Sequence, residues 1–381
     1  MATDVVVLGA GYAGVMAANR MLAAHPEVSV TVVNPRPVFV ERVRLHQLAA
    51  GSGAAAHDLA EVLHPAAVVH LGTAVQIGAD RVLLADGTAL PFDVAIYAVG
   101  SDAGVPAIPG ADRLHSPAEF ERAMDTAAAL DGLGDGAGVV VVGGGLTGVE
   151  SAAEIAEAHP HLTCTLVGDP VAHLPGATRR FVAARLRQLG VRVRPGRVVA
   201  VTGREVLLAG GEAVPAELTI WAGGFAVPDL ARRSGLPVDG TGRLRVDATL
   251  RSTGAANVVG VGDAVTVDGQ DHIRMSCQAA LPLGAHGADT AWALLAGQEP
   301  QPLSLGFVAQ CISLGRASGV VQRTRPDDTS RGGALRGTLG AFGKEMVVRG
   351  TVWTLRRQAR GHGYPFPKGP AAAHDPIAAP R

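Results

Sequence analysis

The chain has 381 residues, 48% hydrophobic and 18% charged, which is enough for two or three globular domains with sizeable cores. Its net charge of −1 argues against a nucleic-acid partner. The three cysteines, Cys164, Cys277 and Cys311, are far apart, so we expect neither a disulfide framework nor a metal site. No apolar run reaches the roughly 18 residues of a spanning helix, and no signal-like N-terminus occurs, which predicts a cytoplasmic protein.

The chain opens with an aliphatic strand followed directly by a glycine-rich turn. Residues 5–8 are Val-Val-Val-Leu, residues 9–14 are Gly-Ala-Gly-Tyr-Ala-Gly, and a small-residue helix to about Ala24 leads to a strand at residues 30–33. In a dinucleotide site the first glycine permits the tight turn, the second lets the backbone approach a pyrophosphate, and the third lets the helix pack on the strand. Residues 9–14, the first glycine loop, therefore either bind a dinucleotide or form a tight turn without a ligand.

The same pattern returns in the middle of the chain. Residues 139–142 are four valines, residues 143–148 are Gly-Gly-Gly-Leu-Thr-Gly (the second glycine loop), and a helix to about Ala158 precedes a strand at residues 163–167. A bare GxGxxG means little in a chain with 50 glycines, but both matches follow four aliphatic residues and open a helical pattern. The repeat predicts two related dinucleotide-binding domains.

Each repeat continues with a hairpin turn and a strand that ends in small residues. The turn signals are Asp-Gly at residues 86–87 and Gly-Gly at residues 210–211. The strands that follow end in Ala-Val-Gly at residues 98–100 and in Ala-Gly-Gly at residues 222–224. Both repeats therefore predict a βαβ unit, a β-hairpin and a further strand, in that order.

An acidic residue commonly ends the second strand of a dinucleotide site and binds a ribose hydroxyl. The two positions in register hold Asn34 and Gly168 instead. Asn34 either contacts the ribose or forms a turn before Pro35, and Asp169 is displaced by one residue. Arginines that would attract a 2′-phosphate appear only at residues 179–180, so NADH is slightly favoured over NADPH.

A third segment, Asn-Val-Val-Gly-Val-Gly-Asp at residues 257–263, predicts a short buried strand that ends in Gly262 and Asp263. Glycine allows a ligand to approach the backbone, and a carboxylate accepts hydrogen bonds from sugar-alcohol hydroxyls. An ordinary turn or helix cap explains the same two residues.

Together these motifs resemble the two-dinucleotide flavoprotein superfamily that includes the pyridine nucleotide–disulfide reductases, and most of all the type II NADH dehydrogenases (NADH:quinone oxidoreductases). The resemblance covers roughly residues 4–295 and implies FAD in the first glycine loop and NAD(P)H in the second, with hydride transfer between them. The FAD contacts that it implies are Gly9, Gly11, Tyr12, Ala13, Gly14, Asn34, Arg36, Arg44, Val75, Ala98, Gly100, Gly262, Asp263, Gln278 and Ala279. The implied NAD(P)H contacts are Gly143, Gly145, Leu146, Thr147, Gly148, Asp169 and Gly223.

The predicted fold class is α/β, with two Rossmann-like (three-layer ββα) dinucleotide-binding domains and a small C-terminal α+β domain. Residues 102–112 and 225–228 are predicted linkers into and out of the second domain. The predicted domains are 1–110 and 227–298 (FAD), 111–226 (NAD(P)H) and 299–381 (C-terminal interface or capping region). Residues 361–381, rich in Pro, Gly and Ala, are expected to form a loose tail.

The sequence departs from these relatives in three places. It has no CxxxxC after the first helix, which argues against thiol relay chemistry. Type II dehydrogenases carry Ala-Gln-x-Ala-x-Gln-x-Gly beside the flavin, and at residues 277–284 Pro282 replaces the second glutamine. Their C-terminal membrane-anchoring region has no clear counterpart here. The electron acceptor therefore stays open between a quinone and another small molecule.

The flavin would carry most of the chemistry, and the protein would position the rings and manage protons. Glu150 is the first candidate for proton management, the alternative being a carboxylate at a helix start. His46 either transfers protons or is structural, and Cys277 is expected to be a buried small residue. The basic segment at residues 345–360, which includes Trp353, either rests on an anionic membrane, caps the flavin domain or joins two subunits.

Three functions fit these expectations. The leading one is an FAD-dependent NAD(P)H:acceptor oxidoreductase. The others are a biosynthetic flavoenzyme that acts on a small molecule, and a slow redox-sensing flavoprotein that resembles apoptosis-inducing factors. All three require both FAD and NAD(P)H.

Overall fold

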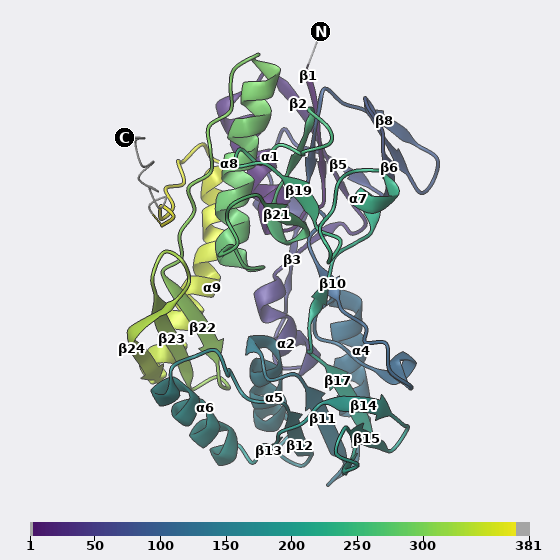
Figure 1. Cartoon of the computed structure of the whole chain (residues 1–381), viewed down its shortest axis with the longest axis vertical. Coiled ribbons are helices and arrows are strands. Elements are labelled where there is room, and N and C mark those ends of the chain that lie inside the picture. Colours follow the sequence, from purple (N-terminus) through teal and green to yellow (C-terminus); the bar gives the residue numbers. More distant parts are fainter. Residues whose placement is uncertain (1–2, 371–381) are drawn as a thin grey trace, which may run out of the picture.

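The computed structural model describes residues 3–370, and its two larger units lie one above the other in Figure 1. The upper unit combines two separate parts of the chain, because strands from residues 3–97 and 258–260 share one sheet. The lower unit lies between those parts in the sequence. A smaller sheet and a long C-terminal helix lie beside them.

The upper unit is built on a parallel sheet with the strand order β20-β9-β1-β2-β5. These strands are β1 (Thr3–Leu8), β2 (Val28–Asn34), β5 (Val68–Leu71), β9 (Val94–Tyr97) and β20 (Val258–Gly260). Residues 5–8 are at most 2% exposed because a parallel sheet is covered on both faces. The covering elements are α1 (Tyr12–Ala24), α8 (Cys277–Leu295) and the antiparallel sheet of β6 (Ala74–Ile77), β7 (Arg81–Leu84) and β8 (Ala89–Pro91).

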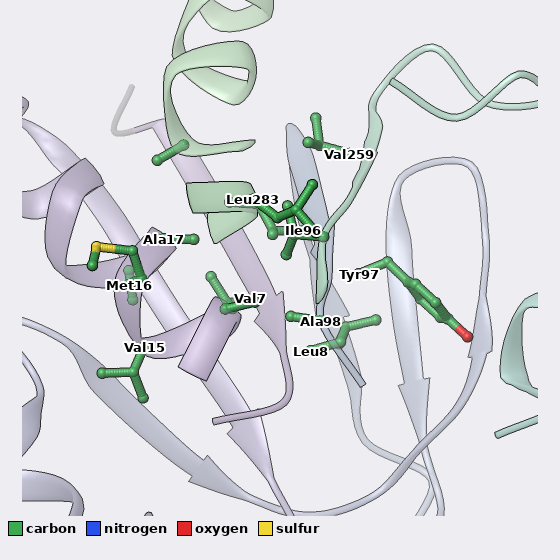
Figure 2. Packing of buried hydrophobic residues seen from close by; sticks show 14 of the residues in the cluster. Val7, Leu8, Val15, Met16, Ala17, Ile96, Tyr97, Ala98, Val259 and Leu283 are labelled. Atoms are coloured by element: carbon green, nitrogen blue, oxygen red, sulfur yellow. The ribbon is translucent and has the colours of Figure 1, made fainter. Parts of the chain in front are cut away.

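Helices α1 and α8 pack on this sheet and against each other (Figure 2). Leu283 of α8 packs in the same cluster as Ile96 and Val259 of the sheet. A Cβ on Gly284 would lie 2.3 Å from the carbonyl oxygen of Ala13, so only glycine allows the helices to cross this closely. The crossing brings the start of α8 next to the first glycine loop.

The lower unit repeats the architecture on a parallel sheet with the order β13-β12-β11-β17. Its elements are α4 (Phe120–Asp131), β11 (Gly138–Val142), α5 (Leu146–Ala158), β12 (Thr163–Val167), α6 (Gly176–Gln188), β13 (Arg192–Arg194), β14 (Val198–Val201), β15 (Glu205–Leu208), β16 (Ala213–Pro215) and β17 (Leu218–Trp221). Val139 and Val141 of β11 pack with the helices, whereas Val140 and Val142 pack with the antiparallel sheet β14-β15-β16. This alternation confirms the predicted three-layer ββα fold.

The two predicted linkers meet. They form the short strands β10 (Asp102–Ala103) and β18 (Phe225–Ala226), which pair antiparallel. The chain therefore enters and leaves the lower unit through one two-stranded connection.

The C-terminal unit consists of one antiparallel sheet and one long helix. The sheet contains β22 (Ala309–Ser313), β23 (Gly319–Thr324) and β24 (Ser330–Gly337), and α9 (Thr338–Gln358) packs on β23 and on α1. Arg316, on the turn between β22 and β23, pairs with Glu154 of α5 at 2.8 Å and donates to Ser52 of the upper unit. Glu154 therefore makes an interdomain contact, and all three units meet there.

The first part of the predicted loose tail, residues 361–370, makes contacts with the rest of the chain. Tyr364 and Phe366 pack against the core of the upper unit. The N–H of Gly306 donates to the carbonyl of Pro367 at 2.9 Å, and the N–H of Gly369 donates to Ser304 Oγ at 3.0 Å. The rest of the predicted tail, residues 371–381, lies outside the described residues.

Short elements complete the fold. They are β3 (Val38–Val40), a 3-10 turn (Arg42–Arg44), α2 (Leu45–Ala49), β4 (Ala56–Asp58), α3 (Leu59–Val62), a 3-10 turn (Ala111–Arg113), α7 (Leu230–Arg233), β19 (Leu244–Val246), a 3-10 turn (Gly262–Ala264) and β21 (Val265–Val267). Within residues 3–370, none of the helices combines the length and the apolar character needed to cross a membrane.

Candidate functional site

The first glycine loop uses its three glycines in three different ways. A Cβ on Gly9 would lie 2.4 Å from the carbonyl oxygen of Ala98, and a Cβ on Gly14 would lie 1.9 Å from that of Gly9. These two glycines are therefore needed for packing. A Cβ on Gly11, in contrast, would meet nothing within 4 Å. The space in front of Gly11 is open to a ligand.

The second glycine loop repeats this geometry position by position. A Cβ on Gly143 would lie 2.5 Å from the carbonyl oxygen of Ala222, and one on Gly148 would lie 1.9 Å from that of Gly143. A Cβ on Gly145 would again meet nothing within 4 Å. Both helices that follow begin at the loop, so their free backbone N–H groups point toward the same open space.

Both loops open into one cavity of about 900 Å³, which lies within the size range of ligand sites. Its wall also includes Gly11, Gly145, the start of α8 and the middle of α9. Two dinucleotide loops that share one cavity can bring two cofactor rings into contact. The open space before Gly11 and Gly145 fits two pyrophosphates, one for each helix start.

A family model described as pyridine nucleotide-disulphide oxidoreductase matches residues 3–284. The chain belongs to this family. As a member it binds FAD and NAD(P)H, and it is an oxidoreductase that passes electrons between a nicotinamide and a flavin. The predicted superfamily and cofactors are thereby confirmed.

Individual relatives place the chain near NADH dehydrogenase-like proteins. The NADH dehydrogenase-like protein Rv1812c of Mycobacterium tuberculosis is 30% identical over 352 residues, which cover 84% of this chain and 87% of that protein. The demethylphylloquinone reductase NdbB of Synechocystis is 25% identical over 350 residues, or 83% of this chain and 86% of that one. The solved sulfide:quinone oxidoreductase of Aquifex aeolicus has a TM-score of 0.80 at 18% identity, covering 94% of this chain and 92% of that chain, and shows the same fold.

Most of the residues predicted from the sequence line the cavity. They are Gly11, Tyr12, Ala13, His46, Ala98, Gly100, Gly143, Gly145, Leu146, Thr147, Glu150, Gly223, Gly262, Asp263 and Gln278. Asp263 accepts a hydrogen bond from Ser101 Oγ at 2.8 Å, which leaves its other oxygen for a ligand hydroxyl. Pro282 is buried and outside this wall, whereas Leu281 is part of it.

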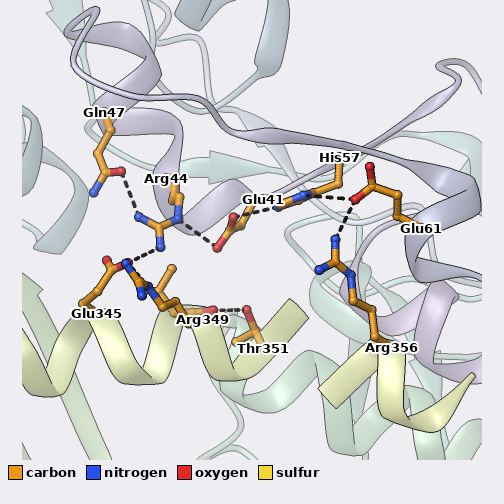
Figure 3. A network of polar contacts seen from close by, with 10 residues as sticks. Glu41, Arg44, Gln47, His57, Glu61, Glu345, Arg349, Thr351 and Arg356 are labelled. Atoms are coloured by element: carbon orange, nitrogen blue, oxygen red, sulfur yellow. Dashed lines mark hydrogen bonds and ion pairs between the residues drawn. The ribbon is translucent and has the colours of Figure 1, made fainter. Parts of the chain in front are cut away.

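The guanidinium of Arg44 binds other side chains of the protein and does not line the cavity (Figure 3). It pairs with Glu41 at 3.1 Å, with Glu345 of α9 at 2.8 Å, and with Gln47 at 3.2 Å. Arg356 of α9 pairs with Glu61 beside it. Arg44 therefore connects α9 to the upper unit, and Arg42 lines the cavity. Contact of Arg44 with FAD remains a prediction.

Asn34 and Arg36 also make protein contacts. Asn34 Oδ1 accepts from the N–H of Ala10 at 3.0 Å, so its side chain supports the first glycine loop from behind. Arg36 pairs with Glu121 of α4 through two bonds of 2.5 and 2.6 Å. Contacts of Asn34 and Arg36 with FAD remain predictions.

The acidic residue missing from β12 has a steric explanation. A Cβ on Gly168 would lie 2.6 Å from the backbone N of Gly144, so no side chain fits there. Asp169 follows and pairs with Arg179 at 2.8 Å, outside the cavity wall. Two other predicted contacts also lie outside it: Val75 on β6, and Ala279, whose N–H is capped by Ser276 Oγ at 3.2 Å.

Glu150 is part of a buried ion pair at the cavity wall. Its Oε1 accepts from Lys344 Nζ of α9 and from the N–H of Ser313, both at 2.8 Å. Burial alone would raise the pKa of Glu150, but Lys344, His46 and these hydrogen bonds outweigh it and lower the pKa. The charge of Glu150 in turn raises the pKa of Lys344 against its own desolvation. A carboxylate of α5 and an ammonium of α9 therefore lie side by side at the cavity wall.

His46 lies on α2 next to this pair and is 4% exposed. Burial lowers the pKa of His46 to about 4, so its ring is neutral at physiological pH. Its Nε2 is buried and has no hydrogen-bond partner within residues 3–370. The ring can therefore form hydrogen bonds to a bound group, and its part in proton transfer remains a prediction.

Sequence reasoning missed the cavity residues contributed by long-range packing. Lys344, Arg42, Arg274 and Cys311 all line the wall, and none belongs to a recognisable motif. Burial raises the pKa of Cys277 to about 11, which agrees with its interpretation as a buried small residue. In the sequence, only the basic and aromatic composition of residues 345–360 indicated that α9 contributes to the site.

Proposed function

We propose that the chain oxidises NAD(P)H through FAD and passes the electrons to a quinone. The observation that carries this proposal is the shared cavity, because it extends from both glycine loops to an apolar wall on α9. Val347, Val348 and Trp353 of α9 and Leu281 of α8 line that part. An apolar wall beside buried charged groups suits a flat ring with two carbonyl oxygens.

The residues of the chain would bind and orient the reactants. Gly11 and Gly145 admit the two pyrophosphates, and Asp263 offers an acceptor for hydroxyls. FAD supplies the ability to take a hydride and release electrons. Glu150 uses one of the three Lys344 donors, and no other acceptor within residues 3–370 binds Nζ, so two donors remain for a bound ring.

The relatives support quinone as the acceptor. NdbB, which matches most of this chain, is a demethylphylloquinone reductase. Pro282 does not argue against a quinone, because Pro282 lies outside the cavity wall and Leu281 occupies the wall instead.

An acceptor screen tests the proposal. Under anaerobic conditions NADH or NADPH should bleach the yellow protein within seconds, and a soluble quinone should restore the colour and support steady turnover. Bleaching without quinone turnover would favour a flavoenzyme acting on another small molecule. Slow bleaching into a persistent charge-transfer absorbance would favour a redox sensor.

We further propose that α9 rests on an anionic membrane, from which a lipid-soluble quinone would enter. Leu339, Phe342, Met346 and Trp353 recur at helical spacing and are 53–67% exposed, so the exposed residues do form one face. Residues 323–368 carry ten Lys or Arg and three Asp or Glu, in a chain of net charge −1. Exposed apolar side chains flanked by cations suit a lipid interface, whereas two such faces would repel each other in a homodimer.

Vesicle co-sedimentation tests this contact. The protein should bind vesicles that contain phosphatidylglycerol and should bind neutral vesicles less. A Phe342→Ser/Trp353→Ser variant should lose most binding, because each aromatic side chain contributes about 2 kcal/mol of apolar burial. The matched control is Val68→Ser, an exposed residue on β5. Equal sedimentation of all three proteins, or a stable dimer that the double variant dissociates, would contradict the membrane contact.

A further inference from the structure

Arg274 is a cavity cation held from two sides. It lies just before α8 and lines the cavity. Its Nε donates to Asp328 Oδ2 at 2.5 Å, and its guanidinium carbon lies 4.6 Å from the centre of the Phe307 ring. Its Nη1 makes no hydrogen bond to the part of the chain that the structure describes. The guanidinium is therefore fixed in place while part of its donor edge stays available.

Asp328 holds this position at a conformational cost. It lies on the turn between β23 and β24 with φ +64°, a left-handed conformation that costs a non-glycine residue roughly 1–3 kcal/mol. Its Oδ2 also accepts from Gln310 Nε2 at 3.0 Å, and its Oδ1 is buried without a partner within residues 3–370. Strain together with a buried unpaired oxygen indicates that the position of Arg274 matters to a bound group.

Arg274 belongs to the FAD side of the cavity. The helix that follows it, α8, crosses α1 at Gly284 and Ala13, directly behind the first glycine loop. Gln278, in the first turn of α8, and Asp263 line the same cavity. Of the other cavity cations, Lys344 is paired with Glu150, and Arg42 donates to the carbonyl oxygen of Ser101.

We infer that Arg274 sets the reduction potential of the flavin and that Asp328 is its positioning residue. This inference rests on the proposed function only in that FAD is the group reduced. A hydride from NAD(P)H carries two electrons and one proton, so NAD(P)⁺ leaves and the flavin ring gains one negative charge. A fixed and partly buried guanidinium stabilises the charged ring more than the neutral one. Arg274 therefore favours reduction.

Spectroelectrochemical titration of the FAD-loaded protein measures this effect without NAD(P)H or quinone. Arg274→Gln should lower the equilibrium constant for flavin reduction about tenfold, which is a potential lower by roughly 30 mV for a two-electron couple. Arg274→Lys keeps the charge and should stay close to the unchanged protein. Arg349→Gln, on the exposed side of α9, is the control and should have no effect.

Asp328→Asn separates charge from position. By charge alone, loss of the carboxylate would raise the potential, whereas release of Arg274 should lower it toward the value of Arg274→Gln. A raised potential would show that Asp328 is not the positioning residue, and equal potentials in Arg274→Gln and the unchanged protein would overturn the inference about Arg274. Retained flavin absorbance verifies that each variant is folded. A protein that does not reduce quinone would contradict the proposed function. The flavin potentials of its variants could still be measured and would still test the role of Arg274.

Discussion

A Gly11→Val variant should fold normally and carry no FAD. A side chain at Gly11 would meet nothing within 4 Å, and the backbone there (φ −81°, ψ −171°) is open to any residue. The valine methyl groups would instead occupy the space required by the pyrophosphate. A clash of about 3 kcal/mol weakens binding by roughly 100-fold. The purified variant should be colourless, with an unfolding transition like that of the FAD-free parent protein.

Gly145→Val is the matched variant in the second loop. It should purify yellow, because the first glycine loop, the proposed FAD site, is untouched, yet NAD(P)H should no longer bleach it at concentrations that bleach the unchanged protein. Gly14→Val provides the contrast, since its Cβ would lie 1.9 Å from a backbone oxygen and should prevent folding rather than binding. A yellow Gly11→Val protein, or a Gly145→Val protein bleached at the normal rate, would contradict the assignment of the loops.

Lys344→Met should cause the second large effect, a loss of about 3–5 kcal/mol in unfolding free energy. The substitution leaves the Glu150 carboxylate, which is 8% exposed, buried without its cation. Chemical denaturation of the flavin-free protein measures the loss. The double variant Glu150→Gln/Lys344→Met removes both charges and should recover most of it, because an uncharged buried pair has no unpaired ion. Equal losses in the single and double variants would argue against the pair.

The same pair should give stability a defined pH window. The folded-state pKa of Glu150 lies below its ordinary 4.5, so its contribution is complete above that value and is lost as pH falls through the folded pKa. The folded-state pKa of Lys344 lies above its ordinary 10.5, so its contribution is complete below that value and is lost as pH rises through the folded pKa. The difference in stability between the parent and double-variant proteins should therefore stay constant from about pH 5 to 10 and shrink outside it.

Local patterns were enough to predict the two βαβ units. Four aliphatic residues, a glycine loop and a small-residue helix follow one another directly, and the predicted strand at residues 163–167 coincides with β12. Each of these features depends only on residues that are close to it in the sequence. The second dinucleotide site was predictable for the same reason, because the second glycine loop repeats the pattern of the first.

Long-range partners explain what the sequence did not reveal. Lys344 lies 194 residues from Glu150, and Glu345 lies 301 residues from Arg44, so no local pattern links them. Arg44 is predicted to contact FAD, and that contact stays a prediction, but its carboxylate partner on α9 could not be seen in the sequence. The sequence shows that the acidic residue is displaced to Asp169. It does not show why, because the displacement depends on the close approach of Gly144 to Gly168.

The upper sheet cannot be completed until a late part of the chain leaves the ribosome. Strand β20 (Val258–Gly260) pairs with β9 (Val94–Tyr97), while all four strands of the lower parallel sheet lie between residues 138 and 221. The inserted unit is therefore synthesised whole while β9 still has an unpaired edge. Translation order thus favours assembly of the lower unit first, with cofactor binding to the upper unit, the proposed FAD site, as a late step in maturation.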